Sequence, residues 1–212
     1  MHRLLLATTN PGKVRELAGP LGAAGFEPVG LNDLRITALA PETGNSFLEN
    51  ALQKARFYFT LAKIPTLAED SGLCVAALAG APGIHSARYG GAAGIEDDAG
   101  RNEFLLRALG TIPPPRTAHY ECALVLLGAR PDPVSAVGEV HGEILTAPRG
   151  AGGFGYDPLF YYPPLRKSFA EIPREEKFAV SHRGNALRKL VEKLGQASPE
   201  QRNSKTPGVV PP

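Results

Sequence analysis

The sequence predicts an α/β fold. Three observations carry this prediction: a short apolar strand at 3–8 that leads into a capped helix, a second capped helix that opens at Ser46, and a hairpin of alternating strands over 117–145. The chain of 212 residues is 43% hydrophobic and 21% charged, which suits one sizeable domain or two closely fused lobes.

Composition excludes several functional classes. The net charge of +2 is too small for a general nucleic-acid or membrane binder, and no apolar run approaches the roughly 20 residues of a membrane span. The first ten residues contain too short an apolar run for a signal peptide. Cys74 and Cys122 lack a CxxC spacing, so we expect buried thiols in a reducing cytoplasm and, for any metal, a hard ion bound by oxygen.

The first two elements are a strand and a helix. Residues 3–8 (RLLLAT) form the strand, Asn10 is the expected N-cap, and Pro11 takes the first helical position. Apolar residues follow at helical spacing at Val14, Leu17, Ala18 and Leu21. Pro20 is expected to end this helix early, because proline lacks the backbone N–H that a helix interior requires.

The middle of the chain predicts a helix and an acidic strand. Ser46 and Glu49 have the spacing of a capping box. The apolar face of the helix that follows is predicted to consist of Leu48, Leu52, Ala55, Phe59 and Ala62. The segment PTLAEDSGL (65–73) predicts a short strand that ends in acidic residues and then turns.

The remaining elements follow in order. A third helix is predicted over 99–110, and the strand TAHYECALVLLG (117–128) alternates apolar side chains, with 133–145 as its hairpin partner. The last helix begins at Ser181 and stops at Gly195. Residues 1–195 therefore form the predicted domain, and the polar, proline-rich stretch 196–212 is expected to be a disordered tail.

The segment TTNPGK (8–13) is the first of four stretches with chemistry. A strand that turns into a helix directs free backbone N–H groups outward, and the helix dipole favours an anion there. Thr8, Thr9 and Asn10 add side-chain hydrogen bonds, and Lys13 places a point charge on a phosphate. The alternative is an ordinary capped helix with a solvated lysine.

The second stretch is acidic. Glu69 and Asp70 are adjacent carboxylates whose repulsion a cation would relieve, and Glu42 is a further candidate ligand. Mg²⁺ binds one or two carboxylates together with waters and substrate phosphates. Glu49 competes with Glu42 as a ligand, although its capping role already explains it. The alternative is a solvated turn.

Basic residues at a helix start form the third stretch. His182 and Arg183 lie in the first turn of the last helix, where cations oppose the dipole, and Lys177 precedes them. Such a violation suggests that a bound anion or an acceptor-rich ligand compensates these charges. The alternative is a mildly unfavourable, solvated helix end.

Four glycines within 150–155 form the fourth stretch, followed by aromatic residues. Phe154 or Tyr156 offers a ring on which a nucleobase can stack, and backbone groups near Asp157 can contact the edge of the base. The alternative is a structural bend with two core aromatics. Taken together, the four stretches describe a magnesium–nucleotide site.

The chain over residues 3–195 resembles the inosine triphosphate pyrophosphatase family. The motifs that carry this resemblance occur in the family's order: ATTNPGKVREL, PETGNSFLENALQKA, AEDSGL, GAPGIHSARYG, GGFGYDPLF, REEK and SHRGNAL. The resemblance implies an elongated two-lobed α/β fold with a long mixed, twisted sheet flanked by helices and an active site in the cleft. It also implies a homodimer that depends on Mg²⁺ and hydrolyses the purine nucleotides ITP, dITP and XTP to the monophosphate and pyrophosphate.

The resemblance also assigns residues. Asp70 would be the general base and a metal contact, with Glu69 and Glu42 in the metal shell. The triphosphate would be held by Thr8, Thr9, Asn10, Pro11, Gly12 and Lys13. The rest of the nucleotide would be bound by Ser71, Phe154, Gly155, Tyr156, Asp157, Lys177, His182 and Arg183. The alanine- and glycine-rich segment GGAAGIEDDAG and the long C-terminal tail depart from the family's pattern without touching a motif.

Two alternatives stay open. Maf-like pyrophosphatases have a similar architecture and act on other nucleotides, but GGFGYDPLF and SHRGNAL argue against them. A non-catalytic nucleotide sensor is the other, and the carboxylates of Glu69 and Asp70 argue against it, because a pure binder gains little from acids beside phosphates.

Overall fold

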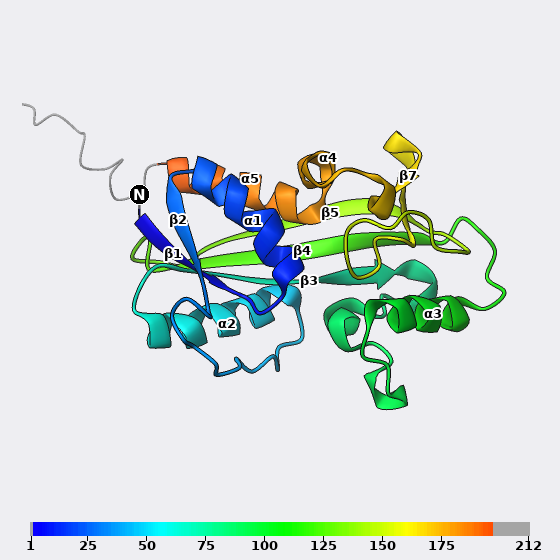
Figure 1. Ribbon diagram of the computed structural model, residues 1–212, viewed down its shortest axis with the longest axis horizontal. Helices are drawn as coiled ribbons and strands as arrows, with labels where there is room; N and C mark the ends of the chain where they lie inside the picture. The colour runs from blue at the N-terminus through cyan, green and yellow to red at the C-terminus, as the bar shows by residue number, and fades with distance from the viewer. Residues whose placement is uncertain (1, 197–212) are drawn as a thin grey trace, which may run out of the picture.

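The computed structural model describes residues 2–196, and within this range the chain forms one open, mixed sheet with helices on both faces (Figure 1). The strands lie in the order β2-β1-β3-β4-β5-β6-β7, parallel from β2 to β3 and antiparallel from β3 onward. The strands are β1 (His2–Ala7), β2 (Phe26–Gly30), β3 (Thr66–Val75), β4 (Thr117–Leu127), β5 (Val134–Ile144), β6 (Phe160–Tyr162) and β7 (Lys167–Ser168). The helices are α1 (Pro11–Ala23), α2 (Phe47–Ala62), α3 (Asp98–Leu109), α4 (Arg174–Val180) and α5 (His182–Gly195).

Three hydrophobic clusters divide the elongated molecule into two lobes joined by β3, β4 and β5. At one end, α1 and α5 pack on one face of the sheet and α2 packs on the other. At the other end, α3 packs with β6 and the far halves of the long strands, around Tyr120 and Phe160. The expected α/β fold with two lobes is confirmed. Within residues 2–196, no helix is both long enough and apolar enough to cross a bilayer.

The predicted helix starts are confirmed by their caps. The side chain of Asn10 accepts from the backbone N–H groups of Gly12 (2.8 Å) and Lys13 (3.3 Å), and Ser181 accepts from Gly184 (3.2 Å). The capping box at Ser46 is only half formed. Ser46 accepts from the N–H of Glu49, but the carboxylate of Glu49 accepts from the N–H of Asn45.

Three details of the predicted elements are wrong. Helix α1 continues past Pro20 to Ala23, because Leu17 and Leu21 are buried on the same face and hold the last turn against the sheet. The predicted buried face of α2 is only partly correct: Ala55 is buried and Leu52 and Ala62 pack against the core, but Leu48 is exposed. The buried residues of α2 are Phe47, Asn50, Ala51, Lys54, Ala55 and Tyr58. The elements β2, β6, β7 and α4 were not predicted.

The third correction concerns β3, which positions the site. The acidic pair lies inside a ten-residue strand and not at its end, because β4 pairs with β3 from Thr66 to Val75. On the opposite edge, β1 pairs with β3 only as far as Ala7 and Ala68. Glu69 is therefore the first residue of β3 beyond the carboxyl end of β1, the kind of position where open α/β sheets bind ligands.

The two cysteines differ in burial. Cys122 is buried as expected, but Cys74 is only half-buried, and both thiols are free. The expected disordered tail at 196–212 falls, beyond its first residue, outside the described residues.

Candidate active site

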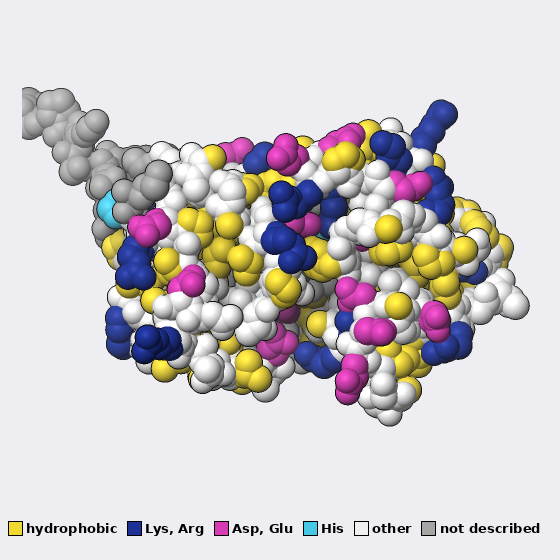
Figure 2. Space-filling view, viewed as in Figure 1, with side chains coloured by type: hydrophobic (Ala, Val, Ile, Leu, Met, Phe, Trp, Pro, Cys, Tyr) yellow, Lys and Arg dark blue, Asp and Glu magenta, His cyan; other side chains and the backbone are white. Residues whose placement is uncertain are grey.

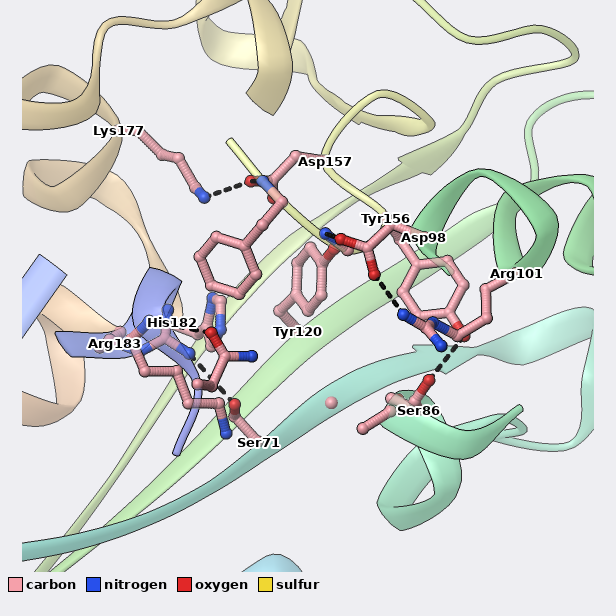
Figure 3. Close-up of a pocket in the computed structure, with 16 residues that line it drawn as sticks. Ser71, Ser86, Asp98, Arg101, Tyr120, Tyr156, Asp157, Lys177, His182 and Arg183 are labelled. Carbon is pink, nitrogen blue, oxygen red and sulfur yellow. Dashed lines mark hydrogen bonds and ion pairs between the residues drawn. The ribbon is translucent and has the colours of Figure 1, made fainter. Parts of the chain in front are cut away.

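A pocket opens between the two lobes, on the face of the sheet that α1 and α5 cover. It contains about 610 Å³ of empty space, including its open mouth, and Figure 2 shows a hollow between the two halves of the molecule. Its lining combines residues of α1, β3, α3, β4, the glycine-rich segment and α5 (Figure 3). The lining residues are Asn10, Lys13, Ser71, Gly72, Ser86, Ala87, Asp98, Arg101, Tyr120, Phe154, Gly155, Tyr156, Asp157, Lys177, His182 and Arg183. The structure thus brings most of the predicted nucleotide-binding residues together.

The start of α1 forms one wall of this pocket. The hydroxyl of Thr8 accepts from the N–H of Asn10 (3.1 Å), and the ammonium of Lys13 lies 3.3 Å from the carboxylate of Glu69. The ring of Phe154 lies directly over Gly12, where a Cβ atom would come within 2.7 Å of the ring. Gly12 is therefore required for the contact between α1 and the glycine-rich segment.

The two adjacent acids of β3 point to opposite faces of the sheet. Successive side chains of a strand alternate, and Ser71 accordingly lies on the face of Glu69, to which it donates at 2.7 Å. Asp70 faces α2, where Asn50 and Lys54 donate to it. A cation shared between Glu69 and Asp70, as their adjacency suggested, does not fit this geometry.

Glu69 belongs to a buried ion network on the α5 face. The guanidinium of Arg183 donates to both carboxylate oxygens of Glu69, at 2.8 and 2.6 Å, and also to Glu16. Lys177 donates to Glu16 at 2.9 Å and forms a second ion pair with Asp157. Burial opposes ionisation of Glu69, but Arg183 and Lys13 outweigh it and hold its pKa well below the usual range.

This network corrects the interpretation of the basic helix start. The charge of Arg183 is compensated by Glu69 and Glu16 from within the protein, and no external anion is needed for that purpose. The same holds for Lys177, whose partners are Glu16 and Asp157. The alternative of a solvated helix end is also wrong, because Arg183 is 1% exposed.

His182 behaves differently from its neighbour. Its imidazole stacks on the ring of Tyr120, with centroids 4.7 Å apart and planes at 11°. Burial, reinforced by the nearby charge of Arg183, lowers the pKa of His182 well below its usual value, so the ring is neutral near pH 7. Its Nδ1 atom is buried and has no hydrogen-bond partner among residues 2–196. His182 thus lines the pocket as a neutral imidazole with one ring nitrogen that is not engaged in a hydrogen bond.

The aromatic residues of the glycine-rich segment divide into two roles. Tyr156 is buried, and its hydroxyl donates to the backbone carbonyl of Ser86 (2.8 Å), which ties the segment to the β3 side of the pocket. Phe154 is half-buried, and its ring lies 4.9 Å from the ammonium of Lys177 and 5.6 Å from the guanidinium of Arg183. Phe154 is accordingly the better candidate for stacking.

Two of the glycines admit other parts of the chain. Gly150 and Gly153 have positive φ angles of 78° and 73°. A Cβ atom would lie 2.6 Å from the backbone of Ala170 at the first and 2.1 Å from the carboxylate of Asp157 at the second. That carboxylate accepts from the N–H of Phe154 at 2.9 Å, and burial raises the pKa of Asp157 despite the facing Lys177. These glycines therefore serve the conformation of the segment, as the structural alternative proposed.

On the α2 side of the sheet, Asp70 of β3 forms a second acidic pair with Glu42, which precedes α2 in the chain. Glu42 and Asp70 both accept from the ammonium of Lys54, at 2.9 and 2.8 Å, and Arg88 donates to the other oxygen of Glu42 at 3.1 Å. Burial opposes the charges, but the facing groups lower the pKa of Glu42 and raise that of Lys54.

This pair suits magnesium, but only in part. Residues 2–196 contain no group of three or more acidic, histidine or cysteine side chains arranged to hold a metal. Two carboxylates that converge on one cation still match the donors of Mg²⁺, which takes its remaining ligands from waters and phosphates. Glu42 therefore fits as a ligand alongside Asp70, whereas the oxygens of Glu69 are engaged by Arg183 and Ser71. Glu49 is not a candidate ligand, because its carboxylate accepts a hydrogen bond from the backbone N–H of Asn45.

Sequence reasoning missed several residues of the site. Asn50 and Lys54 lie four residues apart on the buried face of α2, and polar residues at that spacing on an apolar face were the available signal. Asp98 of α3 accepts from the N–H of Gly155 at 2.7 Å and joins the two sides of the pocket, for which the sequence offers no local signal. The residues missed are Glu16, Asn50, Lys54, Ser86, Arg88, Asp98, Arg101 and Tyr120.

Comparison with known proteins identifies the family. The profile of the Ham1 family matches residues 4–193. The chain belongs to this family. A relative from Yersinia pseudotuberculosis named dITP/XTP pyrophosphatase is 48% identical over 200 residues, which cover 93% of this chain and 100% of that protein. A relative of the same name from Ralstonia nicotianae is 47% identical over 197 residues, 92% of this chain and 97% of that protein.

Solved structures of this family agree with the fold. The HAM1 protein from Coxiella burnetii superposes with a TM-score of 0.82 at 38% identity, covering 93% of this chain and 100% of that one. A nucleoside-triphosphatase, dITP/XTP pyrophosphatase, from Mycobacterium abscessus gives a TM-score of 0.70 at 40% identity, with 91% and 99% of the two chains covered.

Proposed function

We propose that this member of the Ham1 family is a nucleoside triphosphate pyrophosphatase that hydrolyses ITP, dITP and XTP to the monophosphate and pyrophosphate. The observation that carries the proposal is a single pocket in which two groups of residues suit the two parts of a nucleotide. A neutral His182 and the ring of Phe154 suit a purine, and the start of α1 with Lys13 suits phosphates. Relatives that are 48% and 47% identical over more than nine-tenths of this chain carry the name dITP/XTP pyrophosphatase.

The base would be recognised by stacking and by one imidazole. We assign stacking to Phe154 and hydrogen bonding to the 6-oxo group to the side chain of His182. Arg183 already makes four hydrogen bonds to Glu69, Glu16 and Ser71, so we assign it mainly to holding the wall of the pocket.

Asp70 faces α2 and does not line the pocket described above, and its assignment as the general base of the reaction follows the family resemblance. Its carboxylate would accept a proton from water as the water oxygen forms a bond to the α-phosphorus. The bond from that phosphorus to the bridging oxygen breaks, and pyrophosphate leaves. Asn50 holds one oxygen of Asp70 at 3.1 Å and so fixes the orientation of the carboxylate. Mg²⁺ held by Glu42 and Asp70 would neutralise charge on the phosphates. Lys13 would contribute a further positive charge to the triphosphate.

The proposal extends to a homodimer that acts in the cytoplasm on free purine nucleotides, without nucleic acid or membrane partners. Light scattering during gel filtration measures the oligomeric state directly. A monomer at micromolar concentration would remove the dimer from the proposal and leave the chemistry untouched.

A nucleotide panel with Mg²⁺ tests the activity. The full chain should release pyrophosphate from ITP, dITP and XTP much faster than from ATP. In water labelled with ¹⁸O, the label should enter inosine monophosphate, because water attacks the α-phosphorus. Label in orthophosphate would contradict this mechanism, and tight binding of ITP without turnover would favour the sensor alternative.

A further inference from the structure

Lys54 occupies the space between the two carboxylates that suit a divalent cation. Its ammonium lies 2.9 Å from Glu42 and 2.8 Å from Asp70, and the residue is 8% exposed. Lys54 extends from the buried face of α2, one turn after Asn50, which donates to the other oxygen of Asp70. Both oxygens of Asp70 and both oxygens of Glu42 therefore already accept hydrogen bonds from the protein.

The charges of this cluster balance without any metal. Lys54 and Arg88 contribute two positive charges, and Glu42 and Asp70 contribute two negative charges. The two cations are not equivalent. Lys54 bridges both carboxylates and is largely buried. Among residues 2–196, the ion pair of Arg88 is with Glu42 alone, and its side chain is 47% exposed. A buried bridging charge is screened by water much less than an exposed one.

We propose that Lys54 is the resident counter-ion of Glu42 and Asp70, and that a divalent cation reaches both carboxylates only when Lys54 releases at least one of them. This inference rests on the proposed function for the identity of the site. Its consequence is that the nucleotide-free protein binds the cation weakly, so the cation enters together with the triphosphate.

Binding of Mn²⁺ to the nucleotide-free full chain tests this inference, with titration calorimetry as the readout. Lys54→Met removes the bridging charge while keeping an apolar stem of similar length in the buried position. It should bind Mn²⁺ about 5- to 150-fold more tightly than the wild type, which is the usual range for coupling between two binding events. Arg88→Met is the matched control, because it also removes one positively charged partner of Glu42. It should change the affinity by only about twofold, since exposed ion pairs contribute little.

A double variant locates the effect. Adding Asp70→Asn to Lys54→Met should abolish the gain, because the tighter site would have lost one of its two carboxylates. If circular dichroism shows that Lys54→Met is unfolded, Lys54→Gln takes its place. The glutamine side chain carries no charge but can still donate hydrogen bonds.

Three results would overturn the inference. They are unchanged or weaker Mn²⁺ binding by the folded Lys54 variant, an equal gain in Arg88→Met, and absence of binding by every variant at millimolar Mn²⁺. The experiment contains no nucleotide, so it fails or succeeds independently of the pyrophosphatase activity, which the release of pyrophosphate from ITP measures in the wild type.

Discussion

The two faces of β3 differ at neighbouring residues. On the α5 face, Glu69 is 3% exposed and lies in an ion network with the buried residues Arg183 and Glu16, while its further partner Lys13 has a side chain that is 15% exposed. On the α2 face, Asp70 shares Lys54 with Glu42, whose side chain is 33% exposed. The first arrangement is mostly buried beside the pocket, and the second extends further towards the surface.

Adjacent carboxylates can therefore have separate roles. A buried network with satisfied hydrogen bonds resists rearrangement, because any lost partner leaves an unpaired charge in a medium of low dielectric. A cluster that reaches solvent can exchange partners at lower cost. We therefore assign the shape of the pocket to Glu69 and the chemistry to Asp70, and the following variants test that division.

Asp70→Asn should have the largest effect on turnover. Loss of the general base is expected to lower kcat by about 10²- to 10⁴-fold. The KM for ITP should change little, because other residues hold the purine ring and most of the triphosphate. Steady-state pyrophosphate release by the folded variant measures both constants. Near-normal kcat would remove Asp70 from the mechanism.

Glu69→Gln should have the largest effect on stability. It leaves Arg183 with only Glu16 as a charged partner, and breaking a buried pair costs about 3–5 kcal/mol of unfolding free energy. Urea denaturation followed by circular dichroism measures this loss. Glu175→Gln on the exposed side of α4 is the control and should change stability by less than about 0.5 kcal/mol. If Glu69→Gln were as stable as Glu175→Gln, the ion pair between Glu69 and Arg183 would not contribute to stability as proposed.

Phe154→Ala should weaken nucleotide binding without changing base selectivity. Loss of one stacked base costs about 1–3 kcal/mol, and the loss should be similar for ITP and ATP because every purine has a π face. Equilibrium binding in the Asp70→Asn background measures both affinities without turnover. Unchanged affinity for ITP would exclude Phe154 as the stacking ring.

His182→Phe should have a smaller effect, which is a change in the pH dependence of the unfolding free energy. The pKa of His182 is lowered in the folded protein, so as the pH falls below about 6.5 the unfolded chain takes up a proton first and stability declines. The decline is at most about 1.4 kcal/mol per pH unit for one proton. Phenylalanine keeps a ring against Tyr120 and should remove this part of the slope.

Urea denaturation between pH 7 and pH 5 compares the slopes. His141→Gln, at a side chain that is 77% exposed, is the control and should retain the wild-type slope. If His182→Phe and the wild type lose stability in parallel, the imidazole does not carry this pH dependence.

The helix starts and the alternation of the long hairpin could be predicted from the sequence alone. Asn10, Ser46 and Ser181 cap helices where expected, and Tyr120, Cys122, Leu124 and Leu126 are all buried on one side of β4. These features depend on neighbours within a few residues, because caps and side-chain alternation are properties of the local backbone.

Other predictions from the sequence failed for a common reason. The end of β3 was placed too early because the hydrogen bonds that extend it come from β4, more than forty residues later. Pro20 was expected to end α1, but burial of Leu21 against the sheet outweighs the local preference. In both cases packing between distant segments overrides a local signal.

The pairing of the charged side chains depends on the tertiary fold. Lys54 contacts Asp70 across 16 residues, and Arg183 contacts Glu69 across 114 residues. The sequence places Glu69 and Asp70 side by side, but the alternation of a strand separates them, and the helices packed on each face decide their partners. Their roles differ because each carboxylate faces a different layer of the fold.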